Sequence, residues 1–221
     1  MLRRTWTAMP LIGLILAIAG GCADTIGVGG TGRIEVSMAQ SAAAAANVDV
    51  TLQDESGAFA VVPTTTFSSI TVTVTEVHAL AAGADEEADA SWIRLEPVDQ
   101  DVTIDLLALP SEDDGGLLLA LGELPVGTYH NVRIFFSAAT ITLDETVTIG
   151  NRTIEAGTHE LRIPSGAQTG IKIPSASFTV VESDTEEVTL IFDGTASVQT
   201  IVAAGPPQET ILQMSPVLTA R

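Results

Sequence analysis

The sequence predicts an all-β protein, built as a two-sheet antiparallel β-sandwich with Greek-key-like (immunoglobulin/prealbumin-like) connections. Short runs of alternating apolar and polar residues recur along the chain between Gly, Pro, Asp and Ser breaks, which is the pattern of strands with one buried face. Hydrophobic residues make up 46% of the chain and aromatic ones only 4%. Val, Ile, Leu and Ala must therefore supply most of the core, and with many threonines this mixture favours strands. No helix-rich segment interrupts the pattern, so two packed antiparallel sheets are expected.

Residues 1–21 are predicted to be a lipoprotein signal peptide. Arg3 and Arg4 precede an apolar stretch, Leu11–Ala19, that is too short to span a bilayer comfortably. Small residues and Cys22 follow, and "AGGC" resembles the lipobox of bacterial lipoproteins, in which that cysteine is lipidated and becomes the new N-terminus. The leucine usual three places earlier is replaced by Ala19. An ordinary secretory signal or a failed membrane span therefore remains the alternative.

Cys22 is the only cysteine of the chain, so no intramolecular disulfide can form, and a lipid acceptor is the role that best explains it. Acyl chains would attach the protein to a membrane through apolar burial. By resemblance to bacterial sorting rules, Ala23 in place of an aspartate favours the outer membrane, with the protein facing the periplasm or the exterior. Residues 22–32 are Gly-rich and are expected to be a flexible tether.

Residues 33–221 are expected to form a single β-sandwich domain with an insertion at about 39–67, which contains a small hairpin turning at residues 55–57. The clearest strand places Ile70, Val72 and Val74 on one face. The alternation then slips by one residue, which predicts a β-bulge near Thr75–Glu76.

A tight turn in the middle of the chain carries information on architecture. "LPVGTY" combines a leucine, a Pro/Gly turn and Tyr129 just inside the next predicted strand. This resembles the tyrosine corner of Greek-key sandwiches, in which the hydroxyl bonds back to nearby backbone.

The motifs of common enzymes are missing from the sequence. There is no Gly-x-Ser-x-Gly elbow, His-Glu-x-x-His, phosphate loop or dinucleotide fingerprint. His78, His130 and His159 lie in or beside alternating strands, where a structural imidazole is the ordinary explanation. We expect no enzymatic activity and no cofactor. The formal net charge of −19 also excludes nucleic acid as a partner.

The strongest metal candidate is the acidic stretch Asp85–Glu96, which imitates a calcium loop by placing acids at alternate positions and at the twelfth. However, Ala90 stands where such a loop needs glycine, and the ninth position is Ile93. Solvated acids in a hairpin loop are the preferred interpretation, and no metal site is predicted.

The candidate ligand-binding residues are Ser165, Gln168, Thr169 and Lys172. Lys172 is the only lysine of the chain, and period two places it opposite a buried face formed by its two isoleucine neighbours. The preceding loop has glycines at 166 and 170, which let backbone amides approach a partner closely. A sugar hydroxyl or a carboxylate would fit this combination. The alternative, which we favour, is that Lys172 only pairs with a neighbouring acid.

Several stretches together resemble a family of exported bacterial lipoproteins that carry domain of unknown function 4382. They include "FSSITVTVTEVHAL", "LPVGTYHNVRIFF" and "VTLIFDGTASV", and the most specific is "IPSGAQTGIKI". The resemblance covers most of residues 33–221. It implies a lipid-anchored β-rich domain and no catalytic activity.

The function expected from these observations is that of a lipid-anchored cell-envelope module for binding or assembly, without enzymatic activity. Its partner would be a glycan or another envelope protein, and its membrane contact the N-terminal lipid. A purely structural envelope lipoprotein without a ligand is the alternative. A hydrolase whose site is assembled from separate loops comes third.

Overall fold

The computed structural model describes residues 29–41, 49–54, 56–99, 101–164, 166–198, 202–204 and 211–221. Cys22 and Ser165 lie outside these residues. The strands are β1 (Thr31–Gln40), β2 (Asp49–Asp54), β3 (Phe59–Pro63), β4 (Phe67–Ala81), β5 (Trp92–Pro97), β6 (Val102–Asp105), β7 (Leu117–Pro125), β8 (Gly127–Leu143), β9 (Val147–Ile149), β10 (Arg152–Ile154), β11 (Gly157–Arg162), β12 (Ile171–Ile173), β13 (Phe178–Val180), β14 (Thr185–Phe192), β15 (Val202–Ala204), β16 (Ile211–Gln213) and β17 (Leu218–Ala220). The helical elements of the described residues are the short α1 (Gly194–Val198) and the single 3₁₀ turns η2 (Thr64–Thr66) and η3 (Asp89–Ser91).

The all-β prediction is confirmed, but the described strands do not form two separate antiparallel sheets. Fifteen of them belong to one sheet, whose main path is β17-β14-β1-β7-β5-β4-β8-β11-β16-β15-β2-β3. The sheet is mixed, because β1 runs parallel to β14, β11 to β16 and β15 to β2. The expected sandwich is therefore corrected to a large, curled, mixed sheet.

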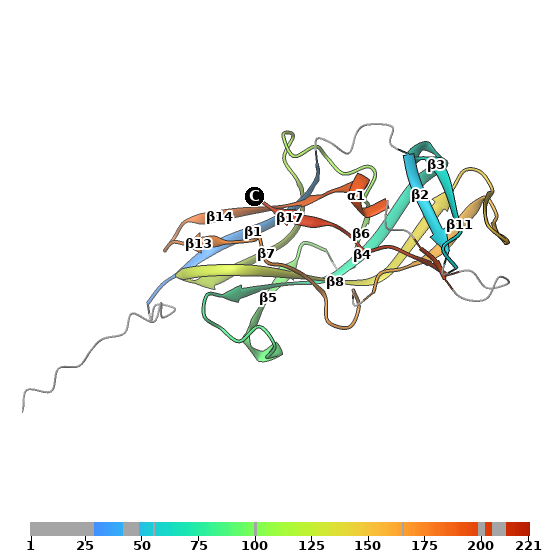
Figure 1. Cartoon of the computed structure of the whole chain (residues 1–221). Coiled ribbons are helices and arrows are strands. Elements are labelled where there is room, and N and C mark those ends of the chain that lie inside the picture. The colour runs from blue at the N-terminus through green and yellow to red at the C-terminus, as the bar shows by residue number, and fades with distance from the viewer. Residues whose placement is uncertain are drawn as a thin grey trace, which may run out of the picture.

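The length of two strands explains this difference. β4 has 15 residues and β8 has 17, and they pair from Phe67–Leu143 to Ala81–Tyr129. Figure 1 shows β8 running beneath β1, β7 and β14 at one end and continuing toward β2, β3 and β11 at the other. The strands at the two ends of the molecule are connected, directly or through neighbouring strands, to the same β4–β8 ladder. They therefore belong to one hydrogen-bonded sheet.

The sheet curls until its distant strands meet. The amide of Ala220 on β17 donates to Ser175 Oγ, in the loop between β12 and β13, at 3.0 Å. The amide of Ser183 donates to the carbonyl of Thr31 at 3.1 Å. Gly32 lies so close to Val181 that no Cβ would fit. This curl encloses one core, to which alternate residues of β1, β4 and β8 contribute fully buried side chains such as Val36, Ile70 and Ile134.

Bulges bend the two long strands. Val74 pairs with Phe136 and Glu76 with Phe135, so Thr75 is the extra residue on β4. This confirms the bulge predicted near Thr75–Glu76. A second bulge lies on β8, where Ser137 is skipped in the register. Two bulges so close together bend the ladder at one place.

The tyrosine corner is also confirmed. The Tyr129 hydroxyl donates to the carbonyl of Pro125 at 2.9 Å. The Tyr129 ring is completely buried and stacks on Phe178 of the neighbouring strand β13, with 5.1 Å between ring centroids. Burial raises the pKa of this phenol above its ordinary value.

The predicted hairpin in the 39–67 region is present as well. β2 and β3 pair antiparallel, and the side chain of Asp54 closes the turn by accepting hydrogen bonds from Ser56 and Ala58. The hydrogen bond from the Ser56 hydroxyl is the main cause of a lowered pKa at Asp54. β15 joins this hairpin to the main sheet through a parallel pairing with β2.

Candidate functional site

A cleft opens in the sheet beside the Ser137 bulge. β11 pairs with β8 only as far as Glu160–Thr140 and then turns away to pair with β16 at Leu161 and Arg162. On the same side of β8, pairing resumes at Ile134 with β12. Among the described residues, the interval between them is bridged by the hydrogen bond from the Phe136 amide to the carbonyl of Gly166. The gap therefore follows from the path of the chain and is closed at both ends.

The cleft has a volume of about 370 Å³, which falls in the lower part of the usual range for small-molecule sites. Its described lining comes from β8, β11 and the loop before β12. The polar members are Ser137, Thr140, Glu160, Arg162 and Gln168, and the apolar members are Phe136, Ala138, Ala139, Leu161, Ile163 and Ala167. The lining therefore mixes polar side chains with apolar ones, several of which are small.

Arg162 distinguishes this cleft electrostatically. Every other arginine or lysine within the described ranges has a carboxylate partner at 3.0–3.8 Å. Arg162 has none there, and its side chain is exposed at the cleft. In a chain of net charge −19, this leaves one exposed guanidinium whose charge no carboxylate of the described residues neutralises.

Only one of the candidate residues named from the sequence lines the cleft in the described structure. Gln168 does so, beyond a turn in which the Gly166 amide donates to the carbonyl of Ile163 at 3.1 Å. Thr169 is exposed beside it but is not part of the lining. Ser165 belongs to the same loop but lies outside the described residues.

Lys172 lies elsewhere and is neutralised. Its ammonium donates to Glu87 Oε1 at 3.0 Å and lies 3.1 Å from Glu86 Oε1. These hydrogen bonds, that of Glu87 foremost, raise the pKa of Lys172. Its neighbour Ile173 is buried, as the alternation predicted. The acid pairing expected for Lys172 is thus present, although the acids come from the loop after β4 and not from a neighbouring strand.

Arg133, the cross-strand neighbour of Lys172 on β8, is the centre of a second charged cluster. Its guanidinium carbon lies 4.4 Å from the Trp92 ring centroid, and it donates to Asp89 Oδ1 at 3.0 Å. It also contacts His78 Nδ1 at 3.3 Å, and His78 Nε2 lies 2.8 Å from Glu76 Oε2. Burial lowers the pKa of His78, although the hydrogen bond that Glu76 accepts from its ring acts in the opposite direction and raises that pKa.

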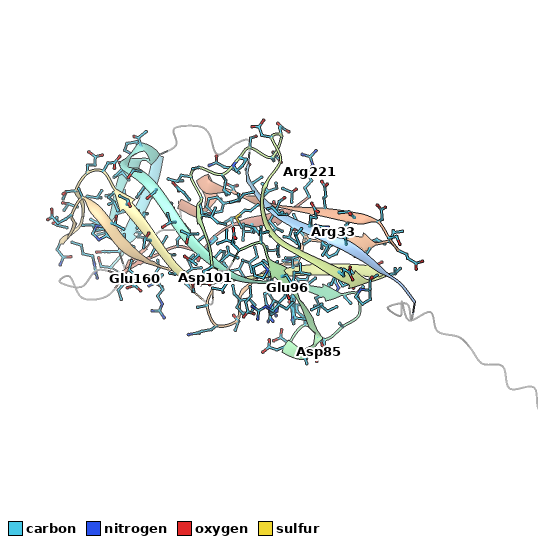
Figure 2. All side chains as sticks on the ribbon, turned by 180° about the vertical axis from the view of Figure 1, so that it is seen from behind. Arg33, Asp85, Glu96, Asp101, Glu160 and Arg221 are labelled. Atoms are coloured by element: carbon cyan, nitrogen blue, oxygen red, sulfur yellow. The ribbon has the colours of Figure 1, made fainter. Side chains whose placement is uncertain are left out.

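The acids at the start of the stretch 85–96 have partners within the protein. Glu86 and Glu87 contact Lys172, Asp89 contacts Arg133, and Asp85 caps the amide of Glu87 at 3.0 Å. Within the ranges that the structure covers, no group of three His, Cys, Asp or Glu side chains is close enough to hold a metal ion. Figure 2 shows Asp85 and Glu160 on well-separated parts of the molecule, so this loop and the cleft are distinct.

The three histidines do not assemble with the cleft. His159 Nε2 contacts the carbonyl of Glu155 at 2.7 Å, and His130 occupies a position skipped in the β8 register. No histidine belongs to the described cleft lining.

Within the residues that the structure describes, no helix has the length and hydrophobicity needed to cross a membrane.

Comparison with known proteins identifies the domain. The sequence model described as Domain of unknown function (DUF4382) matches residues 45–213. The chain belongs to this family. No curated protein and no solved structure matches it. All the residues of the cleft lie within the matched range, whereas Cys22 precedes it.

Sequence reasoning missed Arg162 and Glu160. Both lie directly before the "IPSGAQTGIKI" stretch that carries the family resemblance. Their position beside that loop was a usable signal, but the lack of an ion pair at Arg162 is visible only once the sheet is assembled.

Proposed function

We propose that this DUF4382 protein is a non-enzymatic binding or assembly module, lipid-anchored in the cell envelope, whose ligand site is the cleft between β8 and β11. The observation that carries the proposal is the exposed Arg162 guanidinium, which has no carboxylate partner among the described residues, in a cleft of about 370 Å³. An arginine kept free of the surrounding acids is available to a ligand.

Preorganisation supports this proposal. The cleft walls are strands of the sheet, and the Phe136–Gly166 hydrogen bond fixes the loop that carries Gln168. A site held by strands loses little conformational entropy when a ligand binds. Bulges such as that at Ser137 are frequent beside functional sites, where they redirect side chains.

The N-terminal leader and the negative charge of the protein support the proposed location in the cell envelope. The lipobox-like "AGGC" provides the anchor at Cys22, and the Gly-rich stretch between Cys22 and the start of β1 at Thr31 provides a tether that would keep the domain near the membrane. The acidic body is repelled by anionic headgroups, which leaves its clefts accessible to solvent. We further propose kinship with Greek-key sandwiches, supported by the tyrosine corner at Tyr129.

A structural role is favoured by a specific observation only for the part of the sheet where β12 pairs with β8. There Lys172 and Arg133 are both occupied by acids of the loop between β4 and β5. We assign these residues to holding the loop on the sheet and not to binding a ligand.

The test is a nuclear magnetic resonance titration of the full chain in detergent with three probes: N-acetylglucosamine, glucuronate and alanyl-alanine. The proposal predicts that at least one probe shifts the amide resonances of residues 137–140 and Arg162, and that Arg162→Gln removes the shifts. Arg94→Gln is the matched control, because it removes the same charge from an arginine already paired with Glu76. Unchanged cleft resonances with all three probes, or shifts that survive in Arg162→Gln, would contradict the proposal.

A further inference from the structure

We infer that the ligand of this cleft is a small zwitterion of amino-acid or dipeptide size, whose carboxylate faces Arg162 and whose ammonium group faces Glu160. This inference rests on the proposed function of the cleft. It starts from two opposite charges on β11 that do not pair with each other.

Glu160 and Arg162 lie two residues apart on β11, and both side chains are exposed at the cleft. Side chains at this spacing project from the same face of a strand, with their Cα atoms about 6.6 Å apart. The same spacing on β1 does produce an ion pair, in which Arg33 Nε lies 3.2 Å from Glu35 Oε1. On β11 no such pair forms, so the cleft presents one positive and one negative group side by side.

A zwitterion satisfies both groups at once. A simple anion would neutralise Arg162 but would be repelled by Glu160 and by the net charge of −19. A simple cation would leave Arg162 desolvated without a partner, which is costly when a ligand covers it. A neutral sugar would leave both charges desolvated without an oppositely charged partner.

The remaining lining fits a short peptide-like molecule. Ser137, Thr140 and Gln168 provide hydroxyl and amide groups for a peptide unit, and the three alanines at positions 138, 139 and 167 leave room for small side chains. The volume of about 370 Å³ suits a ligand of this size and is too small for a folded domain.

The test is isothermal titration calorimetry of the full chain in detergent with alanyl-alanine, its N-acetyl form and its C-terminal amide. We expect each blocked form to bind at least about tenfold more weakly than alanyl-alanine, because each loses one charged contact. Arg162→Gln should abolish the difference between alanyl-alanine and the amide. Glu160→Gln should abolish the difference between alanyl-alanine and the N-acetyl form. Arg33→Gln and Glu35→Gln make the same charge changes on β1 and should leave all affinities unchanged.

The outcomes separate this inference from the function on which it rests. If N-acetylglucosamine or glucuronate shifts the cleft resonances while alanyl-alanine does not bind, the cleft is a ligand site and the zwitterion is wrong. If the blocked dipeptides bind as tightly as alanyl-alanine, the two charges have no role in recognition and the inference also fails. If no probe affects the cleft, both proposals fail together.

Discussion

Replacing Tyr129 with phenylalanine tests the hydrogen bond that closes the turn between β7 and β8. The substitution keeps the buried ring and its stacking on Phe178, and it removes only the hydroxyl that donates to Pro125. A hydrogen bond of this kind contributes about 1 kcal/mol net. Pro125 is only half-buried, so water can partly replace the lost donor and the loss should not greatly exceed this value.

The assay is urea unfolding followed by far-UV circular dichroism, in which Tyr129→Phe should lower the midpoint without changing the slope. The melting temperature should fall by about 2–4 °C per kcal/mol for a domain of this size. Because Tyr129 is the only tyrosine, its absorbance also reports its ionisation alone. With the pKa raised by burial, its contribution to stability should be present below pH 10 and lost as the pH rises through the folded-state pKa. An unchanged midpoint together with an ordinary tyrosine titration would refute the tyrosine corner.

Three further predictions concern the anchor, the second charged cluster and the turn before β12. Cys22→Ser should move the protein from the membrane fraction to the soluble fraction, and continued extraction only with detergent would contradict lipidation. Because burial lowers the pKa of His78 below 6.5, its contribution to stability should be present above that pH and lost as the pH falls through the folded-state pKa; a stability–pH curve that His78→Gln leaves unchanged would count against this. Gly170→Ala and Gly83→Ala share the cost of a positive φ, 69° and 77° respectively, which is about 1 kcal/mol. Only at Gly170 would the new Cβ also meet a side chain, Arg133 Cγ at 2.7 Å, whereas nothing lies within 4 Å at Gly83. Gly170→Ala should therefore lower the free energy of unfolding more than Gly83→Ala does. Equal losses of stability in the two variants would show that this contact does not matter.

The features predicted correctly from the sequence are those that nearby residues determine. The bulge at Thr75 follows from the slip in the alternation of β4, and the Tyr129 corner follows from six consecutive residues. The full burial of Ile173 follows from period two, whereas Ile171, expected on the same buried face, is only partly buried.

The features that were missed depend on contacts between distant segments. The parallel pairing of β1 with β14 joins Arg33 to Thr185, and no local pattern specifies such a register. It is this kind of pairing that makes the sheet mixed and curled.

Which cation lacks a carboxylate partner among the described residues also depends on contacts between distant segments. A lone lysine in an acidic chain attracts attention, but whether a cation is free depends on where the acids fold. The β4–β5 loop brings Glu86 and Glu87 to Lys172 and leaves Arg162 without a carboxylate among the described residues. Composition alone cannot distinguish these two cations.

The most direct test of this account compares the dissociation constants of Arg162→Gln and Lys172→Gln for alanyl-alanine, or for whichever probe shifts the cleft resonances. Both substitutions remove one positive charge from the same chain, so their effects on the overall field are matched. The account predicts that Arg162→Gln weakens binding at least about tenfold, while Lys172→Gln leaves it unchanged because its ammonium is already bound by Glu86 and Glu87. Equal losses in both variants, or a loss only in Lys172→Gln, would contradict it.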